Sequence, residues 1–142
     1  MINEKELRIG NLVIDYEKTT HSVCGIKNNI IYSWWLINSV PLIKMMPKDA
    51  GGVLEEDPYI EHVGYYNPIP LTEDWLIKFG FELNHWETEN RDQKTMCLDG
   101  QSIEVWENSS FYMSEIDLFI KSVHQLQNLY FALTGEELNI KP

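Results

Sequence analysis

The segment from Ser122 to Gly135 constrains the fold most, because its beginning, its apolar stripe and its end all indicate one helix. Ser122 and Gln125 form a Ser-x-x-Gln capping box, which satisfies backbone amides of a first helical turn. Gly135 stands where a left-handed residue commonly ends a helix. The apolar residues between them recur at helical spacing: Val123, Leu126, Leu129, Tyr130 and Leu133. The polar residues of this helix are expected to form a solvated face, with a subunit interface or ligand contacts as the alternative: His124, Gln125, Gln127 and Asn128.

The first third of the sequence indicates β-strands. Asn28 and Asn29 separate two runs rich in β-branched and aromatic residues, His21–Lys27 and Ile30–Leu36, and asparagine tolerates the positive φ angles of short hairpin turns. The second run is expected to be buried on both faces for part of its length. We therefore expect residues 1–64 to form a small, strongly bent antiparallel sheet of the SH3-like kind, with a long surface loop at 41–58.

The remainder, residues 65–142, predicts a helix, antiparallel hairpins and the closing helix. Thr72 is placed to cap a short helix that Gly80 ends. Asp99-Gly100 is a strong hairpin signal between two strand-like runs. The predicted strands of this part are 81–86, 94–98, 102–106, 111–113 and 116–120. The fold class is α+β, and 142 residues suit a single domain.

The charge balance excludes several classes of partner. The chain has 22 Asp+Glu against 11 Lys+Arg, a formal net charge of −11. Such a field repels the phosphate backbone of duplex DNA or RNA and anionic membrane surfaces. The sequence shows neither a membrane-spanning apolar run nor a signal peptide, and Cys24 and Cys97 have no redox or metal-ligand spacing. We expect a cytoplasmic protein with reduced, buried thiols.

Enzymatic chemistry is disfavoured by the motifs. The sequence contains no Gly-rich phosphate loop and no Gly-x-Ser-x-Gly nucleophile motif. Its four histidines lack the paired spacing of zinc ligands, so neither a metal nor another cofactor is expected. We expect a binding protein rather than an enzyme.

Aromatic residues are the best candidates for a ligand site. Tryptophan rings that line a cleft stack on planar groups such as nucleobases, although such rings more often fill a core. Arginine and lysine side chains would supply local positive charge for an anionic ligand. The candidate ligand-binding residues are Trp34, Trp35, His85, Trp86, Arg91, Lys94 and Trp106.

Three segments together resemble a largely uncharacterised family of small proteins encoded by phages and prophages of Bacteroides and its relatives. They are Leu7–Val13, Pro68–Phe81 and Val123–Leu138, the last of which (VHQLQNLYFALTGEEL) is the most specific. The resemblance implies a phage accessory protein, of a kind that often acts against host defence. It transfers no functional residues to this chain.

Two functions follow as expectations. The first is sequestration of a small nucleotide-derived host immune signal, in a monomer or a homo-oligomer. The alternative is an acidic inhibitor that binds a host protein, or a nucleic-acid mimic with Glu55, Glu56 and Asp57 on its acidic face.

Overall fold

The computed structural model describes residues 2–37, 40–41, 59–83, 94–106 and 109–141. The chain divides into two compact units, Met1–Ile69 and Pro70–Pro142, hereafter unit 1 and unit 2. Each unit contains one antiparallel sheet, and both α-helices of the described residues belong to unit 2, so the α+β class is confirmed. No helix in the described part of the chain is long and apolar enough to cross a membrane.

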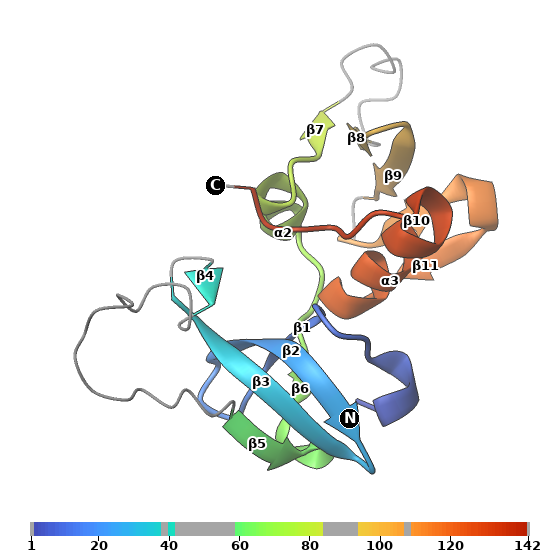
Figure 1. Ribbon diagram of the computed structural model, residues 1–142. Helices are drawn as coiled ribbons and strands as arrows, with labels where there is room; N and C mark the ends of the chain where they lie inside the picture. The colour runs from blue at the N-terminus through green and yellow to red at the C-terminus, as the bar shows by residue number, and fades with distance from the viewer. Residues whose placement is uncertain (1, 38–39, 42–58, 84–93, 107–108, 142) are drawn as a thin grey trace. The chain divides into compact units, whose positions relative to one another are not determined.

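Unit 1 is built on the long hairpin of β2 and β3 (Figure 1). The strand order of its sheet is β4-β3-β2-β1-β6, and β5 also pairs with β3. Its elements are η1 (Glu4–Glu6), β1 (Leu12–Ile14), β2 (Thr20–Lys27), β3 (Ile30–Ile37), β4 (Val40–Pro41), β5 (Tyr59–His62), η2 (Val63–Tyr65) and β6 (Asn67–Pro68). Among the described residues no pairing joins the two ends of this sheet, so it is an open sheet rather than a closed barrel.

Local sequence explains the hairpin of unit 1. Asn28 and Asn29 form its turn with φ angles of 52° and 63°, as their residue type predicts. A bulge between Val23 and Gly25 bends β2, and a Cβ atom on Gly25 would lie 3.3 Å from the Tyr32 side chain. The short turn and the bulge together fix the register of the two longest strands.

The alternation of β3 separates a buried face from a partly exposed one. Ile31 and Ser33 are fully buried and share their face with Trp35. Tyr32 and Trp34 point to the other face and are half-buried. The expectation that this strand is buried on both faces is therefore wrong, because only one face of the small sheet packs on the core of unit 1.

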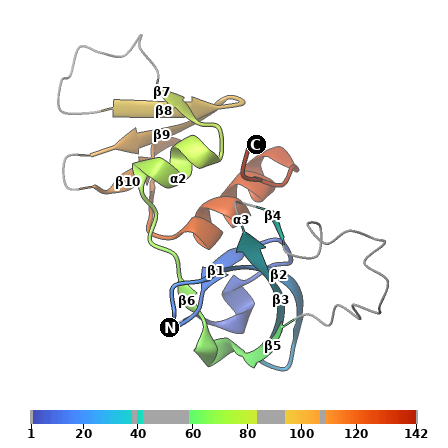
Figure 2. The ribbon, with the colours of Figure 1, turned by 90° about the vertical axis from the view of Figure 1, so that its left-hand side faces the viewer.

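Unit 2 contains a five-stranded sheet whose strands lie between helices α2 and α3 in chain order. Figure 2 shows β8, β9 and β10 edge to edge, and the full strand order is β11-β10-β9-β8-β7. Its elements are α2 (Glu73–Lys78), β7 (Glu82–Leu83), β8 (Lys94–Leu98), β9 (Gln101–Val105), β10 (Phe111–Met113), η4 (Ser114–Ile116), β11 (Leu118–Ile120) and α3 (Val123–Thr134). Asp99 and Gly100 form the β8–β9 turn with positive φ angles, as expected of a hairpin signal.

The closing helix forms where the sequence predicts it. The Ser122 hydroxyl accepts from the Gln125 amide at 3.4 Å, and Gly135 ends α3 with a φ of 75°. The Gln125 side chain accepts from the Lys121 amide, one residue before the predicted cap partner. The polar face is not solvated as expected, because His124 and Gln127 are 4% and 3% exposed.

A returning C-terminal segment explains part of this burial. Gln127 Nε2 donates to the carbonyl of Leu138 at 3.5 Å, and Leu138 is itself buried. Farther along, the Lys141 amide donates to the carbonyl of Lys78 at the end of α2. The tail after α3 thus packs on unit 2. The spacing of apolar residues within the helix does not show this contact.

Candidate functional site

The structure gives the predicted ligand-binding residues different surroundings. Trp34 and Trp35 are neighbours on β3 of unit 1, so their rings point to opposite faces of the sheet. Lys94 lies on β8 of unit 2 and pairs with Glu73, with Nζ and Oε1 3.4 Å apart. Trp106 follows β9 in the same unit. His85, Trp86 and Arg91 lie outside the described residues, as do Glu55, Glu56 and Asp57 of the acidic loop.

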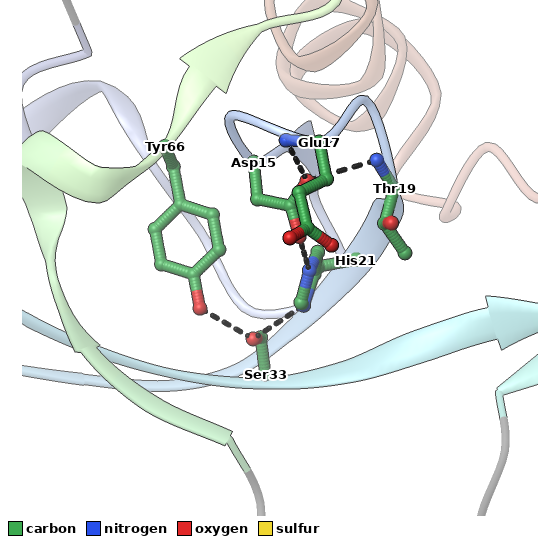
Figure 3. A network of polar contacts seen from close by, with 6 residues as sticks. All are labelled: Asp15, Glu17, Thr19, His21, Ser33 and Tyr66. Carbon is green, nitrogen blue, oxygen red and sulfur yellow. Dashed lines mark hydrogen bonds and ion pairs between the residues drawn. The ribbon is translucent and has the colours of Figure 1, made fainter.

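A buried chain of polar contacts occupies the inside of unit 1 (Figure 3). His21 Nε2 lies 3.0 Å from Asp15 Oδ2, and His21 Nδ1 lies 3.1 Å from the Ser33 hydroxyl. The Ser33 hydroxyl in turn lies 2.8 Å from the hydroxyl of Tyr66. All four residues are at most 4% exposed. We call them the buried network.

Neighbouring strands supply the members of the buried network. Asp15 follows β1, and its Oδ1 accepts from the backbone amides of Glu17 and Thr19, which closes the turn into β2. His21 lies on β2 directly opposite Val13 of β1. The remaining members come from β3 and from the residue after η2, so four separate segments converge on one imidazole.

The contacts form one continuous chain of hydrogen bonds. It runs from the Tyr66 hydroxyl through the Ser33 hydroxyl and the two ring nitrogens of His21 to the Asp15 carboxylate. Burial alone would raise the pKa of Asp15, but the hydrogen bonds from His21 and from the Thr19 and Glu17 amides outweigh it and lower the pKa. Burial raises the pKa of Tyr66 to about 12, against the opposing effect of Ser33. Each member of the network therefore has a hydrogen-bond partner, and the charged Asp15 carboxylate lies at one end of it.

The Asp–His–Ser sequence of contacts has the residue types of a hydrolase triad but not its accessibility. A nucleophilic serine must reach a substrate carbonyl. Ser33 is 0% exposed and its hydroxyl is already held between His21 and Tyr66. The arrangement instead stabilises unit 1 and orients the rings around His21.

Partly exposed aromatic rings lie against this buried network. The His21 ring centroid lies 6.3 Å from that of Trp35 and 5.7 Å from that of Tyr59. Trp35 and Tyr59 are 5.8 Å apart, and Tyr59 contacts Tyr65, which packs edge-on against Tyr16. We call Tyr16, Trp35, Tyr59 and Tyr65 the unit 1 aromatic surface.

Acidic groups lie next to the unit 1 aromatic surface. Partial burial raises the pKa of the Tyr65 hydroxyl, and Tyr59, Asp15 and Glu17 raise it further. Glu17 is exposed and follows Tyr16 directly in sequence, so a carboxylate lies at the edge of the surface. The Tyr16 hydroxyl donates to the Gly64 carbonyl at 3.1 Å and thus ties the outermost ring to η2. The surface combines π-faces with negative potential.

Sequence reasoning identified one of these residues, Trp35, and missed the others. The available signal was a polar residue at an inward position of a strand: His21 two residues before Val23, and Ser33 two residues after Ile31. Buried polar residues need partners, so that pattern indicates a network. Sequence spacing does not reveal that Asp15 and Tyr66 are those partners.

Comparisons with protein-family models, with curated proteins and with solved structures give no match to this chain. Function must therefore be argued from the sites themselves. In the described part of the chain no three His, Cys, Asp or Glu side chains are grouped so that they could hold a metal ion. Cys24 and Cys97 are free thiols, half-buried rather than fully buried as expected.

Proposed function

We propose that this chain is a non-enzymatic binding protein whose unit 1 aromatic surface takes an arginine-rich, basic segment of a partner protein. One observation carries the proposal: partly exposed rings gather into one contiguous group, with the exposed Glu17 next to Tyr16 at its edge. A guanidinium group is planar and charged, so it stacks on such rings and is attracted by their faces and by nearby carboxylates.

Exposure supports a binding role for these rings. Tyr16 is 67% exposed, Trp35 42% and Tyr59 40%, although each is a large aromatic residue. Exposed apolar residues scattered singly need no explanation, whereas contiguous ones mark interaction sites. The ring contacts from Tyr16 through Tyr65 and Tyr59 to Trp35 make this group contiguous.

Charge favours a basic protein segment over a nucleotide. The same rings would stack on a nucleobase, but the exposed carboxylate of Glu17, next to Tyr16, would repel its phosphates. The net charge of −11 acts in the same direction at longer range. Of the two functions expected from sequence, the acidic protein-binding inhibitor is therefore the one we propose. A phage counter-defence setting follows from the sequence resemblance and belongs to the same proposal.

Isothermal titration of the full chain with a short arginine-rich peptide tests the proposal. A twin peptide with citrulline in place of arginine keeps the planar group but removes its charge. We expect binding of the arginine peptide, and binding about five- to tenfold weaker for Trp35→Ala, since cation–π contacts are worth about 1 kcal/mol at such sites. Ile60→Ala is the matched control, because Ile60 is an exposed neighbour of Tyr59 on β5 that points to the other face.

A second variant tests the charge without disturbing any ring. Glu17→Gln should weaken the arginine peptide severalfold, while Glu6→Gln, an exposed acid on η1, should not. Equal affinity for the arginine and citrulline peptides would contradict the proposal. So would saturable binding of mononucleotides or cyclic dinucleotides that is lost in Trp35→Ala, since that result would assign the surface to the nucleotide function.

A further inference from the structure

A second group of aromatic rings lies on one face of the unit 2 sheet. Glu104 of β9, Tyr112 of β10 and Phe119 of β11 stand directly opposite one another across the three strands. The Trp106 ring packs on this row, with its centroid 5.6 Å from that of Tyr112 and 5.1 Å from that of Phe119. The Tyr112 and Phe119 centroids are 4.9 Å apart, so the three rings form one contiguous cluster.

This face is the outward one of its strands. Phe111 and Met113, on either side of Tyr112 in β10, are 3% and 1% exposed and belong to the core. Phe119 is 40% exposed, and Tyr112 and Trp106 are half-buried. Since β11 is an end strand of the sheet, the rings lie at an accessible edge.

Two carboxylates are hydrogen-bonded to the rings of this cluster. The Trp106 indole N–H donates to Glu104 at 3.3 Å, and the Tyr112 hydroxyl donates to Asp117. Donation to a carboxylate pushes electron density into the donor's ring, which makes the π-face more negative. The hydrogen bond to Asp117 is the main cause that raises the pKa of Tyr112, so this tyrosine stays a protonated donor. Both rings are thus polarised toward a cation.

The basic residues of unit 2 with described partners are engaged elsewhere. Lys94 of β8 pairs with Glu73, as described above. Lys78 lies over the Trp75 ring, with Nζ 4.5 Å from the centroid. Unit 2 therefore already contains one cation–π contact, between Lys78 and Trp75. The described contacts of Trp75 include no hydrogen bond from its ring to a carboxylate.

The geometry points to a second binding site for an arginine side chain, formed by Glu104, Trp106, Tyr112, Asp117 and Phe119, which we call the β9–β11 surface. Three contiguous π-faces offer a stacking platform for a planar guanidinium, and the two carboxylates at its rim supply complementary charge. This site belongs to unit 2 and does not depend on the function proposed for unit 1.

Nuclear magnetic resonance of the full chain tests this site separately from unit 1. Titration with the peptide Gly-Arg-Gly-Arg-Gly should shift the Trp106 indole resonance and the backbone amides of β9 to β11 in a saturable way. The citrulline twin should shift them at least about fivefold less at equal concentration. Resonances of Trp35 and Tyr59 report on unit 1 in the same spectra, so either site can fail while the other succeeds.

Asp117→Asn is the informative variant. Asp117 has a φ of 48°, and asparagine tolerates this left-handed conformation, so the backbone is kept while the charge is removed. We expect the dissociation constant read from the Trp106 indole to rise about fivefold, and a comparable rise for Phe119→Ala. Glu82→Gln on β7, the other end strand of this sheet, is the control and should leave it unchanged.

The outcomes separate a binding site from a purely structural cluster. If Asp117→Asn and Phe119→Ala leave the peptide-induced shifts of β9 to β11 unchanged, or if the citrulline twin is as effective as the arginine peptide, the second site is refuted. Unchanged β9–β11 resonances on titration of the unaltered chain would refute it as well, whatever happens at Trp35.

Discussion

Both units carry aromatic rings next to carboxylates, but what lies beneath the rings differs. In unit 1 the rings of Trp35 and Tyr59 rest on His21, which is held by Asp15 and Ser33 inside the sheet. In unit 2 the rings rest on each other across neighbouring strands, and their carboxylates lie at the surface. The unit 1 surface therefore depends on buried polar contacts, and the unit 2 surface on cross-strand stacking.

This difference predicts how each surface responds to change. Buried polar networks lose much when one member is removed, because the remaining groups stay desolvated without partners. Cross-strand pairs at a partly exposed face contribute about 0.2–1 kcal/mol each, and water replaces what is lost. Substitutions in the buried network of unit 1 should thus disturb both stability and binding, whereas substitutions in the β9–β11 surface of unit 2 should disturb binding more than stability.

The largest effect is expected for His21→Leu. It removes the imidazole and leaves Asp15 charged in the interior and Ser33 without its His21 partner, at a cost of about 3 kcal/mol to the stability of unit 1. Hydrogen exchange of the β2 and β3 amides measures this loss without interference from unit 2. Ser22→Ala, next to His21 but on the other face of β2, should change the same exchange rates little. A loss below about 1 kcal/mol for His21→Leu would show that the network is dispensable.

A smaller effect is expected for the two buried tyrosines, and it should differ between the units. Tyr66→Phe removes the hydrogen bond to fully buried Ser33, which costs about 1 kcal/mol. Tyr130→Phe removes a 2.9 Å hydrogen bond to Asp99, but water solvates the exposed Asp99 in its place, so the loss should be about 0.5 kcal/mol or less. Urea unfolding, followed at resonances of each unit, measures the stability loss of each variant. A larger loss for Tyr130→Phe than for Tyr66→Phe would contradict the prediction.

The smallest difference is expected for the pH dependence of Asp15→Asn, which should change how steeply unit 1 weakens in acid. The pKa of Asp15 in the folded chain lies below its usual 3.8, so the carboxylate stabilises unit 1 fully above that pH and loses this contribution as pH falls further. Unit 1 should weaken below about pH 4 in the unaltered chain, and less steeply in Asp15→Asn. Acid unfolding followed separately in each unit is the measurement, and equal acid sensitivity of Asp15→Asn and the unaltered chain would contradict this prediction.

Tyr66 and Tyr130 both have a pKa raised to about 12. The contribution of each tyrosine to stability is therefore lost as pH rises from about 10 through 12, in both units.

Much of the fold was predictable because its signals are local. The caps at Ser122 and Thr72 and the hairpin turns at Asn28-Asn29 and Asp99-Gly100 each depend on a few neighbouring residues, and the structure confirms all four. The buried faces were less predictable. His124 looked solvent-facing, although it is buried, because a helical pattern shows polarity and does not show which segments pack against the helix.

The candidate sites were harder to predict, because their members meet only through the fold. Asp15 and Tyr66 are 51 residues apart in sequence, and both join the network through intermediates on β2 and β3. Trp35 and Trp106 were identified from residue type alone. Their ring partners, Tyr59 for one and Tyr112 and Phe119 for the other, follow from strand pairing that composition does not encode.

The proposed function requires that the unit 1 aromatic surface binds a basic side chain. Intermolecular nuclear Overhauser effects between the arginine side-chain protons of a bound peptide and assigned ring protons of the full chain test it most directly. We predict contacts from the arginine Cδ protons to the rings of Trp35 and Tyr59, lost in Trp35→Ala and kept in Ile60→Ala. A saturated complex in which the arginine protons contact neither ring would contradict the claim.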